Sequence, residues 1–347
     1  MVTLARSTAV LASATLLLAV ATGPADAAGS SYVALGDSYS SGTGTRSYLR
    51  DGTSCERSVY AYPSLIASSR GLSLNLRACS GATTADVARR QLGALTSATR
   101  YVTITVGGND AGLLDVLTEC ALPAWASDCN GAIDQAQGIV SSRLPGRLRT
   151  LYSSIRRRAP QARVLVGGYP RLFNGEDCNA LTWFSPTEQA RLNASADLLN
   201  ARVSAAARAA GFTFSSPVVP FERHAVCADQ EWLNGLSFPT GESYHPNRRG
   251  HSAGYYPLIA ASLTGPVAPT TAVSRPTAES QARRLSRQQH RYAALDRSIR
   301  PEVFRRPDLT SRETRRAATR AGVDLRSRAS IDAVDRRYAE RQARAHR

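Results

Sequence analysis

The sequence predicts an α/β fold, a three-layer α/β/α sandwich with a central parallel sheet. Two observations lead to this prediction: short apolar runs alternate with segments of helical periodicity, and turn residues separate them. Strands buried in a parallel sheet consist of such continuous apolar runs, and helices cover both faces of the sheet. The prediction applies to residues 30–264, a length sufficient to bury a core as one domain.

The order of elements follows from these runs. A helical pattern from Ile133 to Ile155 is interrupted by Pro145, which should break or kink it. Ser185 and Glu188 form a capping box that predicts the start of a later helix, and Gly211 is expected to end that helix. Four apolar runs are expected to be strands, at residues 32–35, 101–106, 163–166 and 212–215.

The amino-terminal residues resemble an export signal. Arg6 precedes a run of small and apolar residues over 9–22, and Ala25-Asp26-Ala27 has the small-x-small pattern of a signal peptidase site. We therefore expect a signal peptide over residues 1–27, cleaved near Ala27, and a secreted, extracellular protein. The alternative is an uncleaved anchor, but the run is shorter than the roughly 20 apolar residues of a spanning helix.

The six cysteines all follow the predicted signal, and their even number fits an oxidising compartment. None forms a C-x-x-C pair, which argues against a zinc site. The sequence alone does not choose among the possible disulfide pairings. The simplest hypothesis joins neighbours along the chain: Cys55 with Cys79, Cys120 with Cys129, and Cys178 with Cys227.

Composition changes at residue 265. Residues 265–347 lack cysteine and tryptophan and hold 20 arginines and nine acidic residues, a formal charge of +11 out of +16 for the chain. This predicts an arginine-rich, mostly disordered tail that is partly helical around 278–297. A different class of function follows from the tail: a cell-envelope binding protein that contacts anionic surfaces. No specific nucleic-acid partner is expected of an exported protein.

Gly36-Asp37-Ser38 directly follows the predicted strand 32–35. A serine at the carboxyl end of a central strand is held rigidly, and its hydroxyl points into the crevice where ligands of open α/β sheets bind. Short clusters of Gly, Asp and Ser also form ordinary turns and helix caps. Whether Ser38 is a nucleophile therefore depends on the residues that accompany it.

A serine nucleophile needs a base, and His245 is the best candidate among five histidines. His245 lies in a turn-rich segment, residues 242–247, just before the last helix expected ahead of the tail. Loops of this kind carry function more often than regular elements do.

Two further turns could supply oxyanion donors. Gly107-Gly108-Asn109-Asp110 follows the strand 101–106 as Ser38 follows the first strand, so both turns should emerge at one edge of the sheet. The Asn109 side chain and the backbone N–H of Gly81 could then donate hydrogen bonds to a substrate oxygen.

These four motifs resemble the SGNH, or GDSL, hydrolase family. Ser38, Gly81, Asn109 and His245 occur in the family's order within residues 30–264. The resemblance implies an SGNH-hydrolase (flavodoxin-like) fold and a serine esterase that forms an acyl-enzyme on Ser38. The oxyanion hole would consist of the N–H groups of Ser38 and Gly81 and the Asn109 side chain.

The six cysteines and the His-Pro-Asn turn resemble the secreted actinobacterial lipase and esterase branch of the family. Members of that branch have three disulfides in sequential pairing, so the resemblance implies the neighbour pairing for this chain. It also implies a lipid or small ester substrate, such as acylglycerols or phospholipid acyl esters. An acetyl-carbohydrate esterase is the alternative. No metal and no cofactor are expected, and we expect a monomer.

One position departs from the family pattern. The family usually places aspartate three residues before the histidine, where this chain has Glu242. Glu242 could orient His245 in place of aspartate. In some members that resemble this chain, the backbone carbonyl two residues before the histidine does so instead, and here that carbonyl belongs to Ser243. We favour Ser243.

Overall fold

A central parallel sheet organises the structure, a computed structural model that describes residues 29–266 and 275–345. Within these residues the sheet has five strands in the order β2-β1-β3-β4-β5. Their bounds are β1 (Ser31–Gly36), β2 (Ser73–Leu76), β3 (Tyr101–Thr105), β4 (Arg163–Gly167) and β5 (Thr213–Ser215). All neighbours run parallel, and Tyr32 pairs with Tyr101 in the centre of the sheet. The predicted parallel sheet is confirmed.

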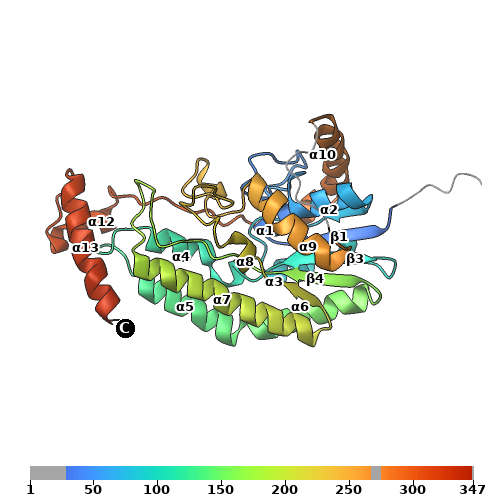
Figure 1. The fold of residues 1–347 in the computed structure, drawn as a ribbon, viewed down its shortest axis with the longest axis horizontal. Helices are drawn as coiled ribbons and strands as arrows, with labels where there is room; N and C mark the ends of the chain where they lie inside the picture. The colour runs from blue at the N-terminus through green and yellow to red at the C-terminus, as the bar shows by residue number, and fades with distance from the viewer. Residues whose placement is uncertain (1–28, 267–274, 346–347) are drawn as a thin grey trace, which may run out of the picture.

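Helices cover both faces of this sheet, as the predicted three-layer sandwich requires. The helices α2 (Tyr62–Arg70) and α9 (Tyr256–Leu263) pack together on one face, and α7 (Pro186–Ala209) lies with α5 (Cys129–Ser142) and α6 (Leu144–Arg158) on the other (Figure 1). The short α3 (Thr84–Asp86) contacts α6, and α4 (Leu113–Cys120) contacts α5.

Local signals set several helix boundaries. The predicted capping box is present at α7, where the Ser185 side chain accepts from the N–H of Glu188 and the Glu188 carboxylate accepts from Ser185. Pro145 marks a break, because α5 ends at Ser142 and α6 begins with this proline in its first turn. Gly211 follows the end of α7 with a φ of 70°, a conformation that favours glycine.

The edge strand β2 is absent from the sequence-based prediction. Its four residues, Ser-Leu-Asn-Leu, alternate between exposed or half-exposed and buried positions. An edge strand with polar residues on one side produces no continuous apolar run, which was the signal used for the other strands.

Three disulfides join the six cysteines in the neighbour pairing that the sequence favours. Cys55–Cys79 lies beside the loop that follows β2, Cys120–Cys129 joins α4 to α5, and Cys178–Cys227 joins two irregular segments. No helix among residues 29–266 and 275–345 is long and apolar enough to cross a membrane. The expected signal peptide, residues 1–27, lies outside the described residues.

The tail differs from the mostly disordered segment that its composition predicts. Its described residues form α10 (Arg275–His290), α11 (Ala293–Asp296), α12 (Arg312–Ala321) and α13 (Arg328–Ala345). The few apolar residues among the arginines explain the helical structure of the tail, because they are buried against the preceding part of the chain. Leu285, Ile299 and Phe304 belong to the main core cluster. The predicted domain boundary at residue 265 stays a prediction.

A second, smaller core holds the far end of the tail. Ala317 and Ala318 of α12 and Ile331 of α13 pack with Trp125 and Trp183, which belong to loops of the preceding region. The indole N–H of Trp183 donates to Asp332 at 3.0 Å. The two tryptophans thus pack against the tail helices, and the guanidinium of Arg328 stacks over the Trp183 ring.

Candidate active site

Ser38 lies at the carboxyl end of β1, where it begins the short helix α1 (Ser38–Ser41). Gly36 permits the sharp turn before it: its φ is 117°, and a Cβ at this position would lie 2.2 Å from the carbonyl oxygen of Thr105. The Asp37 side chain caps α1 by accepting a hydrogen bond from the N–H of Tyr39. The strand and the cap together fix Ser38 at the edge of the sheet.

His245 reaches Ser38 from a distant part of the chain. Its Nε2 lies 2.9 Å from Ser38 Oγ, and its Nδ1 lies 2.9 Å from the carbonyl oxygen of Ser243. Because a carbonyl oxygen only accepts, Nδ1 must carry the proton, and Nε2 is then free to accept from the Ser38 hydroxyl. The structure thus brings the predicted nucleophile and the predicted base into a hydrogen bond.

Burial controls the charge of His245. The imidazole is 2% exposed, and desolvation lowers its pKa to about 4, although the hydrogen bond to Ser243 opposes this shift. The ring is therefore neutral above about pH 5 and able to accept a proton from a serine hydroxyl.

The loops of Gly81 and Asn109 meet beside this pair. Asn109 Nδ2 donates to the carbonyl oxygen of Ala82 at 3.0 Å. Asp110 accepts from both the N–H and the hydroxyl of Thr84, at 2.8 and 2.6 Å. The Gly81 loop is also tied to the nucleophile turn, because the N–H of Cys79 donates to Gly36. The structure therefore brings the loops of all four predicted site residues together.

The sequence profile of the GDSL-like Lipase/Acylhydrolase family matches residues 34–253, a span that includes Ser38 and His245. The chain belongs to this family. GDSL lipases and esterases are carboxylic ester hydrolases, and this chain is one of them.

Curated relatives of this GDSL hydrolase are lipases. Lipase 1 of Streptomyces coelicolor is 43% identical over 258 residues, which cover 73% of this chain and 95% of that protein. A lipase of Streptomyces rimosus is 43% identical over 230 residues, covering 66% of this chain and 85% of that protein.

Two solved structures of Streptomyces enzymes have folds similar to that of this chain. The extracellular lipase from Streptomyces rimosus is 40% identical with a TM-score of 0.64, over 67% of this chain and 99% of that one. Phospholipase A1 from Streptomyces albidoflavus NA297 is 41% identical with a TM-score of 0.64, over 68% of this chain and 100% of that one. About a third of this GDSL hydrolase lies outside each of these matches.

Glu242 faces away from the imidazole of this hydrolase. Its carboxylate accepts a hydrogen bond from the Tyr48 hydroxyl at 2.6 Å and lies 3.3 Å from the guanidinium of Arg46. The hydrogen-bond partner of His245 Nδ1 is the carbonyl oxygen of Ser243 instead. Of the two candidates for orienting His245, Ser243 is the one in contact with the ring.

Asp37 and Tyr169 form a second buried polar pair that the sequence analysis did not assign to the site. The Tyr169 hydroxyl donates a short hydrogen bond to Asp37 Oδ2, and the Thr105 hydroxyl donates to Oδ1 at 2.7 Å. Burial nevertheless raises the pKa of Asp37 to about 6, since these hydrogen bonds offset only part of the desolvation. Tyr169 closely follows the end of β4, and this position after a strand is the sequence signal that could have indicated a site residue.

Two other histidines make structural contacts away from Ser38. His251 is fully buried, where Nδ1 accepts from the N–H of Tyr62 at 3.3 Å, and desolvation lowers its pKa to about 3. His224 stacks on Trp232 with ring centroids 3.7 Å apart. No contact joins either of them to Ser38, whereas His245 Nε2 lies 2.9 Å from Ser38 Oγ.

Proposed function

We propose that this chain is a secreted serine esterase that hydrolyses acyl esters of lipids through an acyl-enzyme on Ser38. The observation that carries the proposal is the continuous hydrogen-bonded series from Ser38 Oγ to His245 Nε2 and from Nδ1 to the carbonyl oxygen of Ser243. A serine hydroxyl is a weak nucleophile unless an oriented base accepts its proton, and this series supplies that base.

The reaction proceeds in two halves. As Ser38 Oγ attacks the ester carbonyl, its proton passes to His245 Nε2, and the Ser243 carbonyl stabilises the resulting imidazolium through Nδ1–H. The tetrahedral intermediate then expels the alcohol, which takes the proton from Nε2. Water repeats the sequence on the acyl-enzyme, with His245 as base again, and releases the acid.

Three donors would hold the oxyanion: the N–H groups of Ser38 and Gly81, and the Asn109 side chain. One N–H of the Asn109 amide donates to Ala82, and its second N–H is the one that would donate to substrate. Loss of one such donor typically lowers kcat by about 10²- to 10³-fold.

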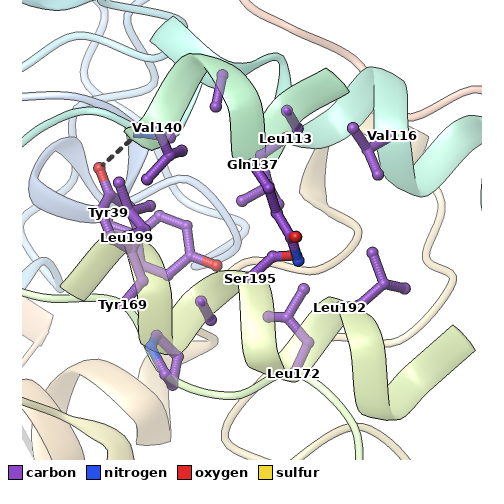
Figure 2. A pocket seen from close by; sticks show the side chains of 15 residues that line it. Tyr39, Leu113, Val116, Gln137, Val140, Tyr169, Leu172, Leu192, Ser195 and Leu199 are labelled. Carbon is purple, nitrogen blue, oxygen red and sulfur yellow. Dashed lines mark hydrogen bonds between the residues drawn. The ribbon is translucent and has the colours of Figure 1, made fainter. Parts of the chain in front are cut away.

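An apolar cavity beside the site supports an acyl-ester substrate. It lies between α4, α5 and α7, and Tyr39 and Gly108, the sequence neighbours of Ser38 and Asn109, belong to its lining (Figure 2). The remaining wall is mostly aliphatic, and Leu113, Val140 and Leu199 contribute to it (Figure 2). Such a lining favours a hydrocarbon chain over a polar group. We therefore place the acyl chain here and keep acetylated carbohydrate as the alternative substrate.

Secretion is supported by the disulfides and by relatives. The chain has three disulfides, and disulfides are common in oxidising compartments and rare in the cytosol. One similar solved structure is described as an extracellular lipase. With the predicted signal over residues 1–27, these observations favour an extracellular enzyme.

The tail could add contact with anionic surfaces. Arg315, Arg316 and Arg320 of α12 are exposed. Retention of the full chain on anionic vesicles at low salt, and its loss at high salt, would support this role. Retention that is independent of salt or of lipid charge would contradict it.

The catalytic proposal is tested with a panel of acetyl, butyryl and long-chain esters and acetyl-xylan. Ser38→Ala should lower kcat/KM on every substrate by at least about 10³-fold. The matched control is Ser141→Ala, which removes an exposed serine hydroxyl from α5. Activity that survives Ser38→Ala would refute the proposal, and turnover of acetyl esters alone would favour the carbohydrate alternative.

A further inference from the structure

A segment of the tail runs beside the site that contains Ser38 and His245, in contact with Gly81 and Tyr244. We call residues 300–306 the strap. It joins α10 and α11 to α12 and α13, which lie toward opposite ends of the molecule (Figure 1). The strap itself has no regular secondary structure. The family profile ends at residue 253, so the strap is an addition to the hydrolase region.

The strap touches the proposed oxyanion hole. A Cβ at Gly81 would lie 2.1 Å from the carbonyl oxygen of Arg300 and 2.8 Å from Cα of Pro301. Real Cβ atoms never come that close to main-chain atoms, so the main chain of the strap packs directly on Gly81. The strap therefore lies against the loop that carries one of the proposed oxyanion donors.

The strap also packs beside the base. The Phe304 side chain is fully buried, and its ring meets that of Tyr244 edge to face with centroids 4.9 Å apart. Tyr244 directly precedes His245, and its carbonyl oxygen accepts from Tyr39, which directly follows Ser38. Beyond Phe304, the N–H of Arg305 donates to Thr118 Oγ1 at 3.1 Å. The Phe304 side chain thus packs the strap against the loop of His245.

Ser38 and His245 expose little surface to solvent in this arrangement. Ser38 is 5% exposed and His245 is 2% exposed. Ester hydrolysis needs an acyl carbon within reach of Ser38 Oγ and an exit for the alcohol. A strap held against Gly81 and Tyr244 would hinder both.

We propose that the strap is a built-in inhibitor that covers the active site until it moves away. The inference rests on the proposed function, because it concerns access to the same serine. It assigns the tail a regulatory role at the catalytic centre, which differs from a role in surface attachment.

Anchors on both sides hold the strap in place. On one side, Asp296 accepts from the guanidinium groups of Arg57 and Arg77, at distances between 2.6 and 2.8 Å, with all three side chains fully buried. On the other side, Asp335 of α13 accepts from the N–H of Ala124 at 2.7 Å. Because both ends are tethered, the strap is present at a high effective concentration over the site.

The test uses the full chain with the strap loosened and the anchors intact. One variant is Phe304→Ala, and a second replaces residues 301–305 with alternating Gly and Ser. The control is Leu295→Ala, which removes a 48% exposed side chain from α11 in the same tail. Two quantities are measured: kcat/KM for a short-chain chromogenic ester, and the rate constant for inactivation by an alkyl phosphonate that reacts with activated serines.

Both loosened variants should show at least a tenfold increase in both quantities, whereas Leu295→Ala should stay within twofold of the wild type. Thermal unfolding shows whether each variant folds. If Phe304→Ala does not fold, the Gly/Ser replacement alone tests the strap proposal. Equal reactivity of wild type and loosened variants would overturn the strap proposal and leave the proposed function intact. Folded variants with lower activity would also overturn it, since the strap would then be part of the working site.

A third result would contradict the proposed function itself. If neither the wild type nor a folded, loosened variant hydrolyses esters or reacts with the phosphonate, Ser38 is not an activated nucleophile. The proposed function then fails, and the strap proposal fails with it.

Discussion

Asp110 accepts hydrogen bonds from both the N–H and the hydroxyl of Thr84, and so joins the loop of Asn109 to the loop of Gly81. Arg147 contributes a further contact to the same carboxylate at 3.1 Å. The spacing of the two proposed oxyanion donors therefore depends on a residue that need not touch the substrate. Asp110 is a positioning residue in this arrangement.

The first prediction concerns this connection. Asp110→Asn keeps the side-chain shape but leaves one carbonyl oxygen to accept from Thr84, and it removes the ion pair with Arg147. We expect kcat to fall by about tenfold with little change in KM, because donors that are misplaced in the transition state lower the rate of the chemical step. Steady-state kinetics with a soluble ester measures both constants.

The exposed Asp229 offers a matched control, and Asp229→Asn should leave both constants unchanged. A rise in KM without a fall in kcat for Asp110→Asn would show that the carboxylate supports substrate binding instead of the oxyanion hole.

The second prediction separates the two residues that precede His245. Glu242→Gln should retain activity within about threefold, because the carboxylate contacts Tyr48 and Arg46 and the imidazole is held by the Ser243 carbonyl. His245→Ala provides the reference for loss of the base. A decrease of about 10⁴-fold in kcat for Glu242→Gln, the size expected when a true triad acid is lost, would assign the orienting role to Glu242.

The third prediction is a pH dependence of the strap. Burial raises the pKa of Glu302 to about 7, and the carboxylates of Asp115, Asp37 and Asp110 add to this shift, while a hydrogen bond from the N–H of Leu114 opposes it. In a released strap the pKa would return to about 4.3. The docked strap therefore binds a proton more tightly than the released one, and docking weakens as the pH rises from about 4.5 to about 7.

Wild-type activity should accordingly increase across this window relative to Glu302→Gln, whose side chain stays neutral. His245 has a pKa of about 4 in the docked state, so its own titration falls at the lower end of the range. The ratio of kcat/KM for wild type and Glu302→Gln, measured from pH 5 to pH 8, isolates the carboxyl group. A constant ratio would mean that Glu302 does not control docking.

The fourth prediction concerns the apolar cavity. Ala136 of α5 belongs to its lining, and Ala136→Phe would fill space that we assign to the acyl chain. We expect kcat/KM for a long-chain ester to fall by at least tenfold, whereas kcat/KM for an acetyl ester should change less than threefold. The acetyl ester is the internal control for folding, because overpacking can destabilise a core. Equal losses on both esters would place the acyl chain elsewhere.

The positions of Ser38 and Asn109 could be predicted from short-range signals, whereas His245 is indicated by its turn-rich loop and by the resemblance to the family. Ser38 and Asn109 follow apolar strands, and the carboxyl ends of neighbouring parallel strands share one edge of a sheet. The partners of Asp37 could not be predicted in the same way. Its contact with Tyr169 spans 132 positions of the chain and depends on the packing of β4 beside β3.

The strap could not be predicted, for a different reason. Composition shows that the tail is rich in arginine, which usually indicates a solvated segment. The contacts that give the tail its structure come from isolated residues, such as Phe304 and Asp296, and their partners Tyr244 and Arg77 lie far away in the chain. A pattern of neighbouring residues contains no information about such single long-range contacts.

The ion pairs of Asp296 affect the cooperativity of thermal unfolding. Arg57 and Arg77 belong to the hydrolase region, yet the carboxylate that they share comes from the tail. If the tail detached, the buried Arg77 would lose its carboxylate partner and Arg57 would keep only Asp51, and an unpaired buried charge is unfavourable. The abrupt change in composition at residue 265 therefore need not separate two folding units. Hydrolase region and tail should share a single cooperative transition.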